Sequence, residues 1–173
     1  IFESVVGPVR ALEHFADDAL KARVIPAVCR GEMMVAVAMS EPDAGTALTD
    51  LRTRAEVRGD RIVLNGTKRW ITNGTVSDIA IVWAQTDDGI QGFIVEKDFP
   101  GFESRDMKGK FSLRVSVTSE LFMSDVEVPE ENRLPGAAGL KGPLSCLTQA
   151  RYGIAWGAIG AAMACYDEVV HYT

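Results

Sequence analysis

Histidine and cysteine are scarce in this chain, and their scarcity argues against several kinds of site. Its only histidines, His14 and His171, lie far apart in the sequence, so neither a metal site nor a serine–histidine–aspartate triad is indicated. The three cysteines, Cys29, Cys146 and Cys165, are odd in number and widely spaced. This pattern is typical of a reduced intracellular chain rather than of a disulfide framework.

Nucleotide-binding fingerprints, basic patches and long apolar runs are missing as well. The sequence has neither a G-x-G-x-x-G pattern nor a P-loop. Lys and Arg number 18 against 24 Asp and Glu, a net charge of −6, so we expect no nucleic-acid partner. The apolar run at residues 152–165 is fourteen residues long, shorter than the roughly 20 that cross a bilayer. We therefore expect no membrane span.

The middle of the chain has the pattern of a β domain. Residues 51–58 alternate between apolar and polar side chains, and Gly59-Asp60 turns the chain into the next run, which predicts a hairpin. Further short runs follow, separated by turn signals at Asp88-Gly89 and Pro100-Gly101. Several short strands at this spacing predict a sandwich or a barrel. We expect Trp83 to pack in its core.

Helical segments flank this β region. Asp17 and Asp18 suit the start of a helix that ends near Gly31, with Pro26 interrupting its pattern. A linker after Pro135 leads to a long helix from about residue 144, whose Ala and Gly residues and Trp156 predict burial in a larger bundle.

These patterns predict an α+β fold in three parts. Residues 1–31 would end an N-terminal helical domain, residues 32–135 would form the middle β domain, and residues 136–173 would form a linker and the first helix of a C-terminal helical domain. The chain begins with Ile1 and stops within a helical pattern. We therefore expect both helical parts to be truncated.

Two loops hold the residues that could carry chemistry. Residues 39–46, MSEPDAGT, follow an apolar run, and residues 69–74, RWITNG, end a β run. An indole, several hydroxyls and backbone N–H donors near small residues suit a cradle for a flat heteroaromatic ligand. Two ordinary turns would use the same residue types, so the local pattern leaves both interpretations open.

Four motifs together resemble the acyl-CoA dehydrogenase flavoproteins. They are MSEPDAGT, NGTKRWITNG, DVEVPEENRLPG and ARYGIAWGAIGA, in the order and at the spacing of that family. From GKFSLRVSVT onward, the sequence is most similar to the glutaryl-CoA dehydrogenases. The resemblance covers nearly the whole chain and implies an acyl-CoA dehydrogenase-like middle β domain with helical segments on both sides.

The resemblance also implies roles for the matched residues. In the family, a T-E-P-x-x-G-S loop binds FAD through its first hydroxyl, which is Ser40 here. Its closing hydroxyl, here Thr46, also reaches the acyl-CoA, whereas Ala47 stands where an acidic residue is usual. We expect FAD contacts from Val37, Met39, Ser40, Gly45, Thr46, Trp70, Ile71 and Thr72, and substrate contacts from Thr46, Leu144, Thr148 and Arg151. An interhelical salt bridge is the alternative for Arg151.

The reaction and the partners follow from the same resemblance. In the family, FAD accepts a hydride from the β-carbon of an acyl-CoA while a carboxylate removes the α-proton, and the glutaryl type then releases CO2 to give crotonyl-CoA. The family's catalytic Glu falls beyond Thr173, so we expect no catalytic residue here and an inactive fragment. A homotetramer, an electron-transfer flavoprotein as acceptor, and the bacterial cytoplasm or mitochondrial matrix are further expectations.

Two alternatives to the glutaryl assignment stay open at this stage. The substrate could be another short or branched acyl-CoA, because the residues that recognise the distal carboxylate of glutarate would precede Ile1. The chain could also be a non-catalytic fragment that binds flavin and CoA.

Overall fold

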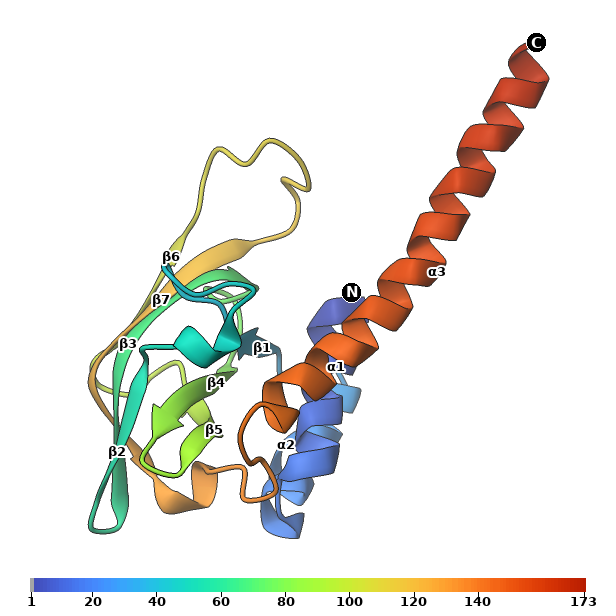
Figure 1. Cartoon of the computed structure of the whole chain (residues 1–173). Coiled ribbons are helices and arrows are strands. Elements are labelled where there is room, and N and C mark those ends of the chain that lie inside the picture. The colour runs from blue at the N-terminus through green and yellow to red at the C-terminus, as the bar shows by residue number, and fades with distance from the viewer. Residues whose placement is uncertain (1) are drawn as a thin grey trace.

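The computed structural model describes residues 2–173, and the surroundings of the side chains from Gly7 onward. A curled β domain lies beside two short helices, and a long C-terminal helix projects away from both (Figure 1). The elements are α1 (Phe2–Phe15), α2 (Asp18–Cys29), β1 (Val35–Ala38), η1 (Leu48–Asp50), β2 (Arg54–Arg58), β3 (Arg61–Thr72), β4 (Ile79–Thr86), β5 (Gly89–Glu96), β6 (Phe102–Asp106), β7 (Thr118–Pro129), η2 (Glu130–Asn132) and α3 (Lys141–Tyr172).

Within the described residues, seven strands form one mixed sheet in the order β1-β4-β2-β3-β7-β6, with β5 paired to β4. The hairpin predicted at Gly59-Asp60 is confirmed, because Arg58 pairs with Arg61 across the turn. Leu51, Thr53 and Ala55 are buried while Arg52 and Arg54 are exposed, as the alternation predicts; Val57 is exposed. The α+β class and the middle β domain are therefore confirmed.

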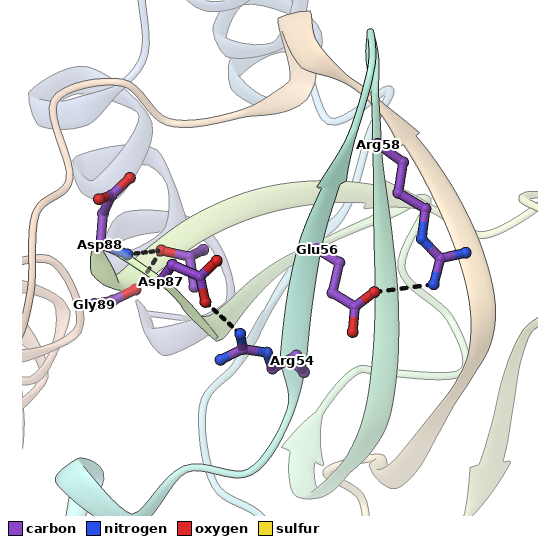
Figure 2. A network of polar contacts seen from close by, with 7 residues as sticks. Arg54, Glu56, Arg58, Asp87, Asp88 and Gly89 are labelled. Atoms are coloured by element: carbon purple, nitrogen blue, oxygen red, sulfur yellow. Dashed lines mark hydrogen bonds and ion pairs between the residues drawn. The ribbon is translucent and has the colours of Figure 1, made fainter.

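Polar contacts join β2 to the β4–β5 turn, and another runs along β2 itself (Figure 2). Arg54 pairs with Asp87, and Glu56 pairs with Arg58 at 2.9 Å. In the turn, the Asp88 N–H donates to Thr86 Oγ1 at 3.1 Å. Both ion pairs are exposed, and exposed pairs contribute only about 0–1 kcal/mol each. Backbone pairing and the buried side chains beneath therefore hold this join.

Helix α2 begins and continues for identifiable reasons. Asp17 caps it, accepting a hydrogen bond from the Leu20 N–H at 2.8 Å, as its position predicts. The expectation that Pro26 interrupts this helix was wrong, because α2 runs through it to Cys29. Leu20, Val24 and Val28 are buried along one face, so packing of that face outweighs the hydrogen bond that a proline removes.

Helix α3 starts against the core and ends outside it. Near its first turn, Gly142 lies so close to Trp83 that an added Cβ would come within 2.4 Å of the indole. Trp83 is fully buried, as expected, and meets the edge of Phe15 at 6.4 Å between ring centroids. Trp156, also expected in the core, is 66% exposed. Burial of Trp156 in a larger helical bundle stays a prediction, because the described residues leave this stretch of α3 uncovered.

The exposed part of α3 is apolar but does not have the character of a membrane segment. Its large exposed side chains are Tyr152, Ile154, Trp156, Ile159, Met163, Tyr166, Val169, Val170 and Tyr172. None of the helices in residues 2–173 combines the length and the hydropathy that crossing a bilayer requires.

A buried ion pair joins β3 to the segment that follows β1. Lys68 is fully buried, and its Nζ lies 2.8 Å from Glu41 Oε1 and donates to the Met39 carbonyl at 3.1 Å. The Glu41 carboxylate also accepts the backbone N–H groups of Arg52 at 2.6 Å and Thr53 at 3.0 Å. Such bonds offset the cost of burying charge, so each member of the pair depends on the other.

Burial and pairing act on both pKa values. Burial lowers the pKa of Lys68 to about 8, and the hydrogen bond and charge of Glu41 oppose this shift. Burial alone would raise the pKa of Glu41, but hydrogen bonds from Lys68 and from the Arg52 backbone leave that pKa below its usual range. Glu41 is therefore a carboxylate at neutral pH.

Replacing Gly142 with alanine should destabilise the protein by about 1–3 kcal/mol, because the rigid indole of Trp83 cannot move aside for the methyl group. Gly157→Ala is the matched control in the same helix, since nothing among the described residues lies within 4 Å of the added Cβ. That control should be neutral or gain up to about 1 kcal/mol from helix propensity. Urea unfolding measures both, and equal stability of the two variants would contradict the packing described here.

Breaking the buried ion pair should cost more than removing it. Glu41→Gln or Lys68→Met alone leaves one buried group without its partner and should cost about 3–5 kcal/mol. The double variant Glu41→Gln/Lys68→Met should recover most of that loss, because neither charge remains. A double-mutant cycle of unfolding free energies tests this, and strictly additive losses would show that the two groups do not interact.

Candidate functional site

A cavity of ≈ 250 Å³ opens between the segment at β1, the end of β3 and the start of α3. Six residues predicted to contact a cofactor line it: five come from the two loops singled out in the sequence, and Val37 comes from β1 directly before the first loop. These residues are Val37, Met39, Ser40, Trp70, Ile71 and Thr72. The fold therefore brings together side chains that are thirty positions apart in the chain, such as Ser40 and Trp70.

A β-bulge in β3 places Trp70 at this cavity. Lys68 pairs with Leu121 of β7 and Ile71 pairs with Ser119, so β3 carries one extra residue between these two pairs. A bulge of this kind bends a strand and re-aims a side chain. Trp70 has a positive φ of 63°, which is uncommon for a bulky residue, and its side chain is 58% exposed. The strand thus accepts local strain to leave an indole at the cavity wall.

Arg69 holds the bulge on two sides. Its backbone N–H donates to the Ser40 carbonyl at 2.8 Å, which ties the two cavity walls together. Its guanidinium lies over the Trp70 ring, 5.2 Å from the centroid, and Nε lies 3.3 Å from Glu120 Oε1. A guanidinium over an indole is an attractive cation–π arrangement. The Trp70 ring is therefore supported on the side where Arg69 lies.

Gly45 and Thr46 do not line the cavity. Both are exposed, in the part of the loop that continues past a tight turn between Glu41 and Ala44. The Glu41 N–H donates to the Ala44 carbonyl at 2.8 Å, and the Ala44 N–H donates to the Glu41 carbonyl at 3.3 Å. Contacts of Gly45 and Thr46 with FAD, and of Thr46 with substrate, stay predictions.

The substrate residues predicted on α3 lie on another face of the helix from the one that lines the cavity. Leu144, Thr148 and Arg151 are exposed and absent from the lining, and the Thr148 hydroxyl donates to the Leu144 carbonyl at 3.1 Å. Their spacing of four and three residues puts them on one side of a helix. A role for this face in substrate binding stays a prediction.

Sequence reasoning missed several lining residues. They are Gly7 of α1, Val35 and Ala36 of β1, and Cys146, Leu147, Gln149 and Ala150 of α3. Cys146 has an apolar surrounding, and burial raises the pKa of its thiol to about 11. The helical period could have grouped Cys146 with Ala150, but only the docking of α3 on the core shows which face meets the cavity.

The chemistry of the lining suits binding and orientation more than proton transfer. The walls combine aliphatic side chains, one indole and the hydroxyls of Ser40 and Thr72, and no carboxylate or histidine within residues 7–173 lines this cavity. No three His, Cys, Asp or Glu side chains of the described chain gather as a metal site would need. A flat, mostly apolar ligand with a polar edge matches this set of groups.

Comparison of this chain with known proteins identifies a family with this architecture. The model of the "Acyl-CoA dehydrogenase, middle domain" matches residues 36–126. A curated relative, the mitochondrial isovaleryl-CoA dehydrogenase of Pongo abelii, is 37% identical over 172 residues, which are 95% of this chain and 41% of the relative.

Two solved structures of glutaryl-CoA dehydrogenase from Mycobacterium smegmatis are also similar. One is 48% identical with a TM-score of 0.87 and covers 89% of this chain and 40% of that chain. The other, in complex with FADH2, is 46% identical with a TM-score of 0.88 and covers 90% and 40%. The chain thus spans about two fifths of the length of these relatives, and it belongs to the acyl-CoA dehydrogenase family.

Proposed function

We propose that this chain provides the flavin-binding part of an FAD-dependent acyl-CoA dehydrogenase. The observation that carries the proposal is the meeting of Ser40, Trp70 and Thr72 in one cavity. These are the positions at which the family's motifs predict contacts with the flavin ring. A relative in complex with FADH2 adds support.

The residues present fit the ring system of FAD. The cavity, at ≈ 250 Å³, lies just below the range of about 300–1,000 Å³ of small-molecule sites, so it would hold the flavin ring rather than the whole dinucleotide. Three of its lining residues, Gly7, Ala36 and Ala150, have small side chains or none and leave room for a ring. The half-exposed indole of Trp70 offers a flat surface for packing, and the Ser40 and Thr72 hydroxyls can bond a polar ring edge.

FAD, when bound, supplies a hydride acceptor for the β-carbon of an acyl-CoA. The residues of this chain would orient the ring and exclude water from its apolar face. The hydroxyls of Ser40 and Thr72 would donate hydrogen bonds, which gain strength where negative charge develops. A base for the α-proton must come within about 3 Å of it, and we place that base outside residues 7–173, because no carboxylate of the described cavity can serve.

For the substrate of the complete protein, we propose glutaryl-CoA, oxidised and decarboxylated to crotonyl-CoA. The 48% identity to a glutaryl-CoA dehydrogenase over most of this chain supports this choice. A branched substrate is the second candidate, because the isovaleryl-CoA relative is 37% identical. We further propose an electron-transfer flavoprotein as the acceptor and a homotetramer as the assembly, both on the family resemblance.

Thr72→Val should change the bound flavin, because it removes one hydroxyl and keeps the side-chain shape. We expect the dissociation constant for FAD to rise about three- to tenfold, as one lost hydrogen bond implies, together with a shift of the visible flavin absorption. Thr49→Val, at an exposed threonine outside the cavity, is the matched control. A Thr72→Val protein with the FAD affinity and spectrum of the wild type would remove Thr72 from the site.

Steady-state kinetics on a panel of acyl-CoA thioesters tests the substrate. The quantity to compare is kcat/KM, because an enzyme discriminates between substrates by the ratio of these values. Glutaryl-CoA should have the highest kcat/KM and should release CO2. A clear preference for isovaleryl-CoA or butyryl-CoA would reject the glutaryl assignment and leave the flavin proposal in place.

A further inference from the structure

Residues 39–41, of which Met39 and Ser40 line the cavity, are each bonded to Lys68 or Arg69, the two residues directly before the lining residue Trp70. The Met39 carbonyl accepts a hydrogen bond from Lys68 Nζ at 3.1 Å, and the Ser40 carbonyl accepts one from the Arg69 N–H at 2.8 Å. Glu41 Oε1 accepts one from Lys68 Nζ at 2.8 Å. Of these three bonds, the ammonium of Lys68 supplies two.

Lys68 lies directly before the β-bulge that carries Trp70. It is the last residue of β3 in register before the bulge, pairing with Leu121. The bulge beyond it holds Trp70 at a φ of 63°. Strained backbone of this kind persists only where the surrounding structure fixes it. The fully buried Lys68 side chain therefore anchors the base of the bulge and, through Met39, the segment that carries Ser40.

Stability alone does not require a charged pair here. A buried ion pair can often be replaced by uncharged groups of similar volume with little loss of stability. An uncharged methionine at position 68 would fill the space but would donate nothing to the Met39 carbonyl. That carbonyl belongs to a residue of the cavity wall, directly before Ser40.

We propose that Lys68 is a positioning residue of the flavin site, which holds Met39 and Ser40 against the Trp70 wall through its hydrogen bond to the Met39 carbonyl. The proposal rests on the proposed flavin-binding function. Lys68 does not touch the flavin; it sets where the Ser40 hydroxyl and the Trp70 ring stand relative to each other.

The two variants of the ion pair separate this role from a purely structural one. Glu41→Gln breaks the pair but leaves Lys68 in place as a donor, and a neutral amine still donates a hydrogen bond. Glu41→Gln/Lys68→Met removes both charges together with that donor. Stability should therefore fall in Glu41→Gln, whereas the flavin properties should change in the double variant.

The experiment uses the complete protein and FAD as the probe. It records the urea unfolding midpoint of the protein, its dissociation constant for FAD, and the absorption spectrum and midpoint potential of the bound flavin. For Glu41→Gln we expect a lower unfolding midpoint with a flavin spectrum like that of the wild type. For the double variant we expect an unfolding midpoint near that of the wild type, an FAD dissociation constant about tenfold higher, and a shifted spectrum and potential. Lys97→Met, which breaks the exposed pair with Asp78, should leave all flavin readouts unchanged.

The outcomes are distinct. If the flavin readouts follow stability, disturbed in Glu41→Gln and normal in the double variant, then Lys68 serves only the fold and the inference is overturned. Should the double variant be poorly folded, Glu41→Gln alone still decides, because a shifted flavin spectrum there would contradict the proposal. A wild-type protein that binds no FAD would instead overturn the proposed function itself.

Discussion

Lys68 and Glu41 are buried together where the segment after β1 crosses the end of β3, and the shape of the cavity depends on this contact. Each group makes further hydrogen bonds besides the ion pair. Lys68 also donates to the Met39 carbonyl, and Glu41 also accepts the N–H groups of Arg52 and Thr53. One pair thereby fixes both cavity walls and the chain that leads into β2. Because buried charges are costly when alone, a sequence that keeps one of these residues must keep the other.

The third wall of the cavity is placed by packing rather than by charge. Trp83 lies in the core between Phe15 of α1 and the first turn of α3, and Gly142 lets the helix approach the indole closely. This docking sets both the axial position and the rotation of α3. Cys146 and Ala150 reach the cavity for that reason. The electrostatic contact at Lys68 and the steric contact at Trp83 thus fix different sides of one site.

Local pattern predicted those features of the molecule that local forces determine. The alternation at residues 51–58, the turn at Gly59-Asp60 and the Asp17 cap follow from side-chain direction and backbone conformation, and the structure contains all three. The continuation of α2 through Pro26 escaped prediction because tertiary surroundings decide it: a packed face carries the helix past its proline. At the site, the residue pattern pointed to the two loops but left ordinary turns open, and flavin contacts there were predicted only from the family resemblance. The bulge at Trp70 and the cavity-lining face of α3 were not predicted, because each depends on a partner remote in sequence.

The groups around the cavity share one chemical property, which is that none of them exchanges protons readily at neutral pH. Hydroxyls, an indole and aliphatic side chains form most of the wall, and burial moves the pKa of Cys146 upward to about 11. Glu41 directly follows the lining residue Ser40, and Lys68 lies two residues before Trp70. Their charged groups are bonded to each other and to the backbone. If this wall holds the flavin, as we propose, its residues supply packing and hydrogen bonds to the ring but no general base. In the proposed reaction the proton and the hydride leave adjacent carbons, so the base must be carried by another element that reaches the same substrate as the flavin does.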